Sequence, residues 1–279
     1  MLAPFTAALT GTTIEKEFRA LASSIARVSP SDAVFDVRAY DPLSVARGRK
    51  HWSERMVDEY GSTAVFGALA TQMMEANAPL DATAVALRMG QDELIHAEAC
   101  ARVVKALGGP PGRLRETDPT PIARHPGYSA RERVLRNVVF ATCVSEMNSV
   151  AYFVASLEEM TDPFLRGVTR QLLADEVLHG SFGFHFLEGS RAWLEEEPVL
   201  RDSIGRYLRY GFAVAERAIT QGSDSHVDMR QDDRALGLMH PHEISEIFQR
   251  TMAEAVVPGL ERFGIPAEDA WRRRTLQAD

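Results

Sequence analysis

Apolar residues recur three and four positions apart along four long segments of the chain, which is the spacing of one face of a helix. Two of these segments begin at a clear signal, because Asp41-Pro42 and Asp162-Pro163 each place a capping carboxylate directly before a proline. Only short turns separate the first segment from the second and the third from the fourth. The pattern therefore predicts two antiparallel hairpins, with helices at residues 42–76, 82–107, 130–160 and 163–194.

The stretch between the two hairpins, residues 108–129, is rich in proline, glycine and charged residues. It is too long for a hairpin turn and suits a crossover along the length of a helical bundle. Shorter amphipathic patterns predict a helix at 13–27 and further helices at 199–220, at 242–262 and after Pro266. The polar stretch 221–241 predicts a loop.

We therefore expect an all-α fold, with a single domain over residues 1–279. Its parts would be an N-terminal arm at 1–40 that packs on the outside, a four-helix core at 41–194, and C-terminal helices at 195–279 that pack on this core.

Each predicted hairpin repeats one pattern of acidic residues and histidine. In the first helix of each hairpin a single glutamate, Glu59 or Glu146, lies within the apolar stripe. The second helix carries Asp-Glu-x-x-His, at residues 92–96 and 175–179 and nowhere else in the chain. Glutamate and histidine three positions apart lie on one face of a helix. Because such groups are costly inside an apolar helix unless something neutralises them, the repeat indicates a buried metal site.

The repeat supplies four carboxylates and two imidazoles. We predict as metal ligands Glu59, Glu93, His96, Glu146, Glu176 and His179. Glu54 and Asp58 lie near Glu59 but off the apolar stripe, so Glu59 is preferred. Bundles with one glutamate on each of two helices and Glu-x-x-His on the other two bind two metal ions. Four carboxylates balance two divalent cations, and this ligand set suits iron or manganese better than copper or structural zinc.

Asp92 and Asp175 each precede a predicted ligand glutamate and lie four residues before the histidine. We expect each to accept a hydrogen bond from the imidazole nitrogen that does not bind metal. Whether each aspartate serves the histidine of its own helix or of the facing helix stays open.

Over residues 41–194 this pair of motifs resembles the ferritin-like superfamily of carboxylate-bridged di-iron proteins. The resemblance implies an antiparallel four-helix bundle with a long crossover between its second and third helices. It also implies a non-haem centre of two iron ions that reacts with O₂, with manganese or a mixed manganese–iron pair as alternatives.

Three features of the sequence indicate which branches of this superfamily the chain does not resemble. Residues 195–279 follow the predicted bundle, whereas ferritins end soon after it, so iron storage is less expected. Cys100 stands where ribonucleotide reductase small subunits typically carry a radical tyrosine, which argues against a stored tyrosyl radical. Leu172 stands where the arylamine N-oxygenase group carries an extra histidine, so amine oxidation is not specifically supported.

The resemblance implies an oxygenase or oxidase that uses O₂ to oxidise a small organic substrate. The chain has no ferredoxin or flavin motif, so its electron donor would be external. Candidate pocket walls, one or two turns from the ligands, are Thr63, Phe66, Met89, Cys100, Thr142, Cys143, Val150 and Phe153. Alternatives that stay open are a ferroxidase or iron-handling protein, a di-manganese catalase-like enzyme, and a metal-free helical interaction protein.

Composition narrows the class of protein. The 279 residues carry a net charge of −8 with 45% apolar residues, and no basic patch or Lys/Arg run indicates nucleic acid or an anionic membrane. Cys100 and Cys143 form no CxxC motif, which fits a reducing cytoplasm. The sequence shows no signal peptide and no run of about 20 apolar residues, so we expect a cytoplasmic protein that does not span a membrane. Whether the protein forms a homodimer stays open. Neither His51 nor His125 is assigned a role in the predicted site.

Overall fold

The computed structural model describes residues 11–25, 33–110, 122–220 and 228–277 of the chain. Helices make up 80% of the structure, and the described residues contain no strand. The predicted all-α class is therefore confirmed.

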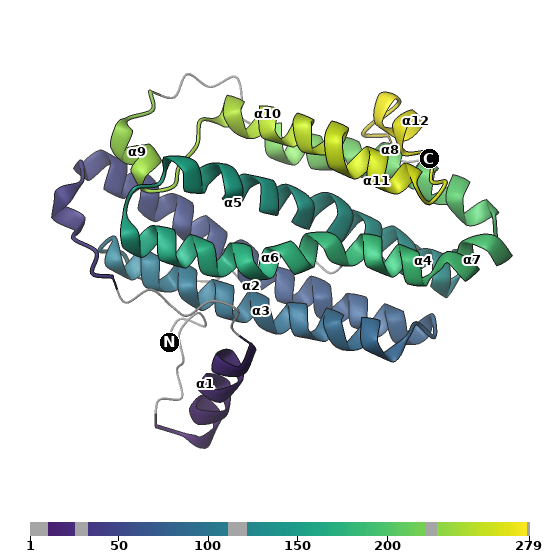
Figure 1. Cartoon of the computed structure of the whole chain (residues 1–279), viewed down its shortest axis with the longest axis horizontal. Coiled ribbons are helices and arrows are strands. Elements are labelled where there is room, and N and C mark those ends of the chain that lie inside the picture. Colours follow the sequence, from purple (N-terminus) through teal and green to yellow (C-terminus); the bar gives the residue numbers. More distant parts are fainter. Residues whose placement is uncertain (1–10, 26–32, 111–121, 221–227, 278–279) are drawn as a thin grey trace.

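The first hairpin consists of α2 (Pro42–Glu75) and α3 (Leu80–Ala106). The carboxylate of Asp41 accepts hydrogen bonds from the backbone N–H groups of Leu43 and Ser44, at 2.9 and 3.2 Å, so α2 begins at the predicted cap. Asn77 reverses the chain between the two helices with a φ of +52°. Figure 1 shows α2 and α3 side by side and running in opposite directions, in contact along their length.

The third long segment is continuous but not uniform. It consists of α4 (Ala130–Val138), the π-helix η2 (Val139–Glu146) and α5 (Met147–Glu159). The prediction of one uninterrupted α-helix at 130–160 is therefore wrong at its centre. A π-helix bonds each N–H to the carbonyl five residues earlier, which widens the turn and changes the direction of the side chains.

The fourth segment, α6 (Pro163–Gly189), starts at Asp162, whose carboxylate accepts a hydrogen bond from the Leu165 N–H at 3.0 Å. It ends five residues earlier than the predicted 194, because the chain bends at Ser190 before α7 (Arg191–Glu196). Gly183 of α6 lies directly against Thr142 and Cys143 of η2, where an added Cβ would overlap both side chains.

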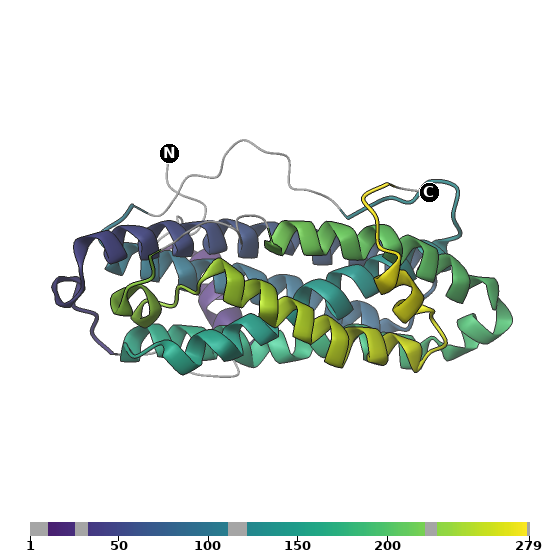
Figure 2. The same ribbon diagram turned by 90° about the horizontal axis from the view of Figure 1, so that it is seen from above.

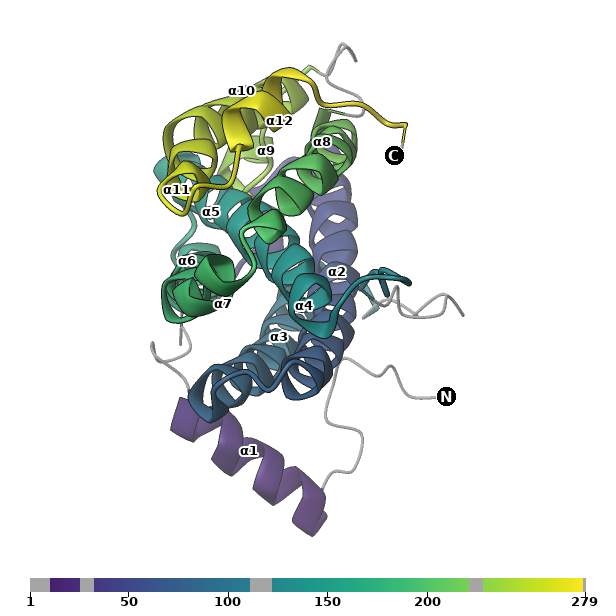
Figure 3. The same ribbon diagram turned by 90° about the vertical axis from the view of Figure 1, so that its right-hand side faces the viewer.

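The four long segments surround one interior, as the end-on view of Figure 3 shows. Contacts join α2 to α3 and to α4, and α6 to α3, η2 and α5. The segment Ala130–Glu159 is long and apolar enough to cross a membrane by those two criteria alone. In this fold it packs against α6 and α8 (Val199–Thr220), and the core helix of a soluble protein meets the same criteria.

The helices after α7 cover the α4–α5 side of this arrangement (Figures 1 and 2). They are α8 (Val199–Thr220), α9 (Gln231–Ala235), α10 (Pro241–Thr251), the π-helix η3 (Met252–Val256), α11 (Val257–Glu261) and α12 (Ala267–Arg272). The segment 221–241, predicted as a loop, thus contains a short helix, α9. This helix is held in place by buried Asp233, whose carboxylate accepts a hydrogen bond from Arg47 of α2 at 2.8 Å.

The N-terminal α1 (Thr13–Ile25) lies outside the long helices, beside α3 (Figure 3). Arg19 of α1 forms two hydrogen bonds with the carboxylate of Glu98, at 2.6 and 2.7 Å. The short 3₁₀-helix η1 (Val37–Ala39) precedes α2. Half of the predicted crossover, residues 111–121, lies outside the described residues.

Candidate metal centre

The six predicted ligands meet in the interior between the four long segments. One ligand atom each from Glu59, Glu93, His96 and Glu176 lie within 4.8 Å of one another. The same holds for Glu93, Glu146, Glu176 and His179. Glu146 is partly exposed, and the other five side chains are buried. Each group can hold a metal ion, and neither includes Glu54 or Asp58.

The two groups share Glu93 and Glu176, the glutamates of the two Glu-x-x-His motifs. A carboxylate has two oxygens, so each of these residues can face both groups at once. Glu59 and His96 complete one group, and Glu146 and His179 complete the other. The two groups therefore overlap, with two carboxylates in common.

Both imidazoles turn Nδ1 toward the carboxylates. Nδ1 of His96 lies 3.4 Å from Oε2 of Glu59 and 3.4 Å from Oε1 of Glu176. Nδ1 of His179 lies 3.0 Å from Oε1 of Glu93. Four buried atoms of the cluster have no hydrogen-bond partner within the described part of the chain. They are the two histidine Nδ1 atoms, Glu93 Oε1 and Glu176 Oε2. Buried donor atoms in that state need another partner, and a cation in the centre of the cluster would supply one. The residues therefore fit a bound metal.

The two motif aspartates each serve the histidine of the facing helix. Asp175 Oδ2 on α6 lies 3.3 Å from Nε2 of His96 on α3, and Asp92 Oδ2 on α3 lies 3.3 Å from Nε2 of His179 on α6. An Nε2–H that donates to a carboxylate leaves the lone pair of Nδ1 directed into the cluster. Of the two pairings that the sequence allows, the fold therefore adopts the one between helices.

A single guanidinium joins the two aspartates. Nε of Arg88 lies 3.2 Å from Oδ1 of Asp92, and its Nη2 lies 3.7 Å from Oδ1 of Asp175. Arg88 was not among the predicted site residues, although its position four residues before Asp92 on one helix face is a spacing at which opposite charges pair.

Burial and the closeness of several carboxylates shift the pKa values of the glutamates in the cluster. Burial raises the pKa of Glu93 well above its ordinary value, and the charges of Glu59 and Glu176 raise it further. Burial and the charges of Glu176 and Glu93 do the same to the pKa of Glu146. Burial opposes ionisation of Glu59 too, but its close contact with the His96 imidazole and the charge of that imidazole lower the pKa of Glu59 to about 2. Without a cation, the cluster therefore retains protons that a divalent metal would displace.

Arg55 places a second cation beside the cluster. Its Nη1 lies 3.3 Å from Oε1 of Glu59, and its guanidinium packs 4.4 Å from the ring centre of Phe153 and 4.9 Å from that of Tyr152. The Tyr152 hydroxyl lies 3.2 Å from Nε2 of His51. The sequence assigns His51 no role, because its partner lies on another helix and only the fold brings the two together.

None of the eight residues proposed from the sequence as pocket walls lines the cavity that the structure shows beside η2. Phe66 packs on the imidazole of His179, with ring centres 5.5 Å apart. Thr142 donates a hydrogen bond to the Val138 carbonyl at 2.7 Å. The apolar stripe that marks the ligands points into the packed interior, so its members fill the core around the site. Phe66, Thr142, Cys100, Cys143, Met89 and Phe153 are buried, and Thr63 and Val150 are partly exposed.

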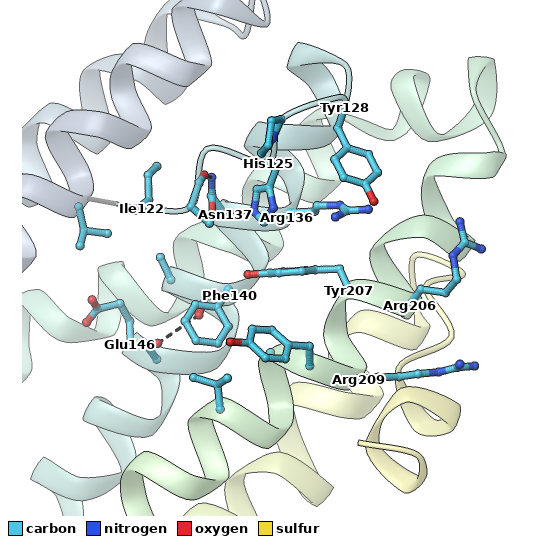
Figure 4. A pocket seen from close by; sticks show the side chains of 18 of the residues that line it. Ile122, His125, Tyr128, Arg136, Asn137, Phe140, Glu146, Arg206, Tyr207 and Arg209 are labelled. Carbon is cyan, nitrogen blue, oxygen red and sulfur yellow. Dashed lines mark hydrogen bonds between the residues drawn. The ribbon is translucent and has the colours of Figure 1, made fainter. Parts of the chain in front are cut away.

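A cavity with a volume of about 980 Å³ lies between η2, α8 and the segment 122–128 (Figure 4). Glu146 lines it and is the only one of the six predicted ligands that does so. Ser62 and Val65 of α2 also contribute, each one position away from a predicted wall residue. Arg206 and Tyr207 of α8 were not predicted, because α8 lies outside the repeated hairpins.

Comparison of this chain with models of protein families, with curated proteins and with solved structures finds no match.

Proposed function

We propose that this protein is a ferritin-like, non-haem di-iron oxidoreductase that uses O₂ to oxidise a small organic substrate. Its main support is the pair of overlapping ligand groups that share Glu93 and Glu176 in the interior of the fold. A structural metal site tends to be closed by its protein ligands. Six ligands for two ions leave coordination positions for O₂ or water, which favours catalysis.

The arrangement of the helices supports the fold assignment within this proposal. We assign α2, α3, the α4–α5 segment and α6 to an antiparallel four-helix bundle in which the second and third helices are joined by a long crossover. Pairing of α2 with α3 and of α5 with α6, together with the contacts of α2 with α4 and of α3 with α6, is what such a bundle requires.

The choice of two divalent ions follows from charge. Four carboxylates carry four negative charges, which two divalent cations neutralise with both imidazoles uncharged. Glu59 and His96 would hold one ion and Glu146 and His179 the other, with Glu93 and Glu176 between them. Carboxylates with one imidazole per ion favour iron or manganese. Bound iron would supply the binding and reduction of O₂.

The protein itself would orient the metal ligands and exclude water from the site. Asp175 and Asp92 orient the two histidines by accepting from Nε2. Phe66 and Cys100 are buried beside the cluster and would exclude water from it. Glu146, the one partly exposed ligand, faces the cavity and marks the side from which a substrate would approach.

The cavity is the observation that favours an organic substrate over Fe(II) or peroxide alone. Its aromatic lining, which includes Phe140 and Tyr207, suits an organic molecule better than a hydrated ion. Electrons would come from an external reductant.

Anaerobic titration with Fe(II), followed by optical spectra on addition of O₂, tests this function. We expect about two ions per chain in the wild type, fewer in Glu176→Ala and in His179→Ala, and new absorption after O₂ in the wild type but in neither of these two variants. Glu188→Ala, which removes an exposed glutamate of α6, is the control and should keep both ions. Unchanged iron content in Glu176→Ala and His179→Ala would overturn the site. Turnover of excess Fe(II) without organic substrate would instead indicate a ferroxidase, and O₂ release from peroxide by manganese-loaded protein a catalase.

A further inference from the structure

The cavity beside η2 combines cationic and aromatic side chains with a single carboxylate. Its lining residues include three arginines, whereas Glu146 is the one acidic residue among them. In a chain with a net charge of −8, this is a local reversal of charge. The lining of this cavity therefore favours an anion over a cation.

Two of these arginines already have carboxylate partners. Arg136 donates to Glu132 at 2.7 Å and packs 3.6 Å from the ring centre of Tyr128, and Arg209 donates to Asp269 at 2.9 Å. Arg206 differs, because no carboxylate among the described residues pairs with it. Its exposed guanidinium, at the edge of the cavity in Figure 4, is open to an anion that enters from solvent.

Tyr207 forms an aromatic wall deeper in the cavity. Its ring meets His125 edge to face with centres 5.0 Å apart and Phe140 with centres 6.5 Å apart. Figure 4 shows its hydroxyl directed toward the side of the cavity on which Glu146 lies. Burial lowers the pKa of His125, so its imidazole is neutral at pH 7 and does not compete with Arg206 for an anion. Flat apolar groups pack well between aromatic rings in this geometry.

We propose that this cavity binds a small organic anion with a flat apolar body, of the arylalkanoate type, with its carboxylate at Arg206 and its apolar end toward Glu146. The orientation follows from the lining, because Arg206, which has no carboxylate partner among the described residues, lies at the edge and the aromatic rings lie between it and Glu146 (Figure 4). The identification of this anion as the substrate rests on the proposed function, whereas its binding to the cavity does not need metal.

Binding is therefore tested on metal-free, full-length protein by calorimetry. The probes are benzoate, 3-phenylpropanoate and 5-phenylpentanoate, each compared with the neutral amide of the same length. We expect at least one carboxylate to bind about tenfold more tightly than its amide, since a charge-assisted hydrogen bond to Arg206 adds roughly that much. Arg206→Gln should remove this difference. Arg217→Gln, which removes an exposed arginine of the same helix outside the cavity, should preserve it.

Val214→Trp, which fills the cavity from α8, should abolish binding of acids and amides alike. Equal affinities of each acid and its amide, or an acid affinity that survives both Arg206→Gln and Val214→Trp, would overturn the site.

The orientation is tested by a crystal of metal-free protein with the para-bromo derivative of the tightest acid. The anomalous bromine peak should lie nearer to Glu146 than to the Arg206 guanidinium, and the opposite order would overturn the orientation. A protein that binds these acids in the cavity but takes up no iron would refute the proposed function and leave the anion site standing.

Discussion

Asp175 on α6 lies 3.3 Å from Nε2 of His96 on α3, so the orientation of a histidine in one hairpin depends on a carboxylate of the other. The pair of Asp92 and His179 repeats this relationship in the opposite direction at the same distance. Outer partners of metal-binding histidines set which nitrogen faces the metal and how basic it is.

Asp175→Asn should weaken metal binding at the proposed position that contains His96. The amide keeps the size of the side chain but not the charge that holds the Nε2–H, and loss of such a partner typically costs about 10–100-fold in metal affinity. Competition with a chelator of known affinity measures this change. Asp81→Asn, at an exposed acid in the first turn of α3, should have no effect. Wild-type affinity in Asp175→Asn would show that His96 does not need Asp175.

Arg88→Gln should weaken metal binding at both proposed positions together. Its guanidinium contacts Asp92 and Asp175, and its loss leaves two buried carboxylates close to each other without their shared cation. The same chelator titration should therefore show both ions released more easily, in contrast to Asp175→Asn. Arg102→Gln, further along α3, serves as the matched charge control. An effect confined to one ion would mean that Arg88 supports only one aspartate.

Gly183→Ala should destabilise the fold. A Cβ at this position would overlap Thr142 and Cys143, and inserting a methyl group into a packed interior typically costs about 1–3 kcal/mol. Gly67→Ala is the control, because no described atom lies within 4 Å of its added Cβ on α2. That change should stabilise by roughly 0.5–1 kcal/mol through the helix preference of alanine. Urea denaturation of both variants compares the free energies of unfolding, and equal values would show that α6 and η2 can move apart freely.

The metal-free protein should lose stability as the pH rises through the neutral range. Burial and neighbouring carboxylates raise the pKa of Glu93 and Glu146, and hydrogen bonds to carboxylates outweigh burial and raise the pKa of His96 and His179. The folded chain therefore binds more protons than the unfolded chain, and the free energy of unfolding falls as these protons leave. The lowered pKa of Glu59 has the opposite effect on the free energy of unfolding, but only in acid, between pH 4.5 and about pH 2.

Urea denaturation of chelator-treated protein between about pH 5 and 8 measures this dependence. Glu93→Gln, which removes one of the retained protons, should reduce the slope. Metal should reverse it, because bound cations replace the protons and their affinity rises with pH. A metal-free protein whose free energy of unfolding stays constant or rises over this range would contradict the prediction.

Local signals made much of the fold predictable. A capping side chain followed by proline acts within one turn, so the starts of α2 and α6 at Asp41 and Asp162 could be read directly. The six clustered residues were predictable for a related reason. A lone carboxylate in an apolar stripe is costly, and its repetition in two hairpins at similar spacing indicates that both hairpins contribute to one neutralised cluster.

What the sequence did not reveal depends on contacts between elements. A π-helix differs from an α-helix by one residue in its hydrogen bonds, and the apolar stripe through Val139, Thr142 and Glu146 fits either. The pairing of Asp175 with His96 needs the distance between two helices. The cavity was missed because its walls lie beside the apolar stripe and on α8, whose Arg206 and Tyr207 have no local pattern that marks them.

The crossed pairs of aspartate and histidine have a consequence for symmetry. Each hairpin offers one lone glutamate, one Glu-x-x-His and one aspartate for its neighbour, so neither hairpin alone surrounds a complete site. A single hairpin that met a second copy of itself about a two-fold axis would present the same donors twice. One chain thus contains two similar hairpins that two identical peptides could supply as a dimer. The metal would then lie at the interface between the two hairpins.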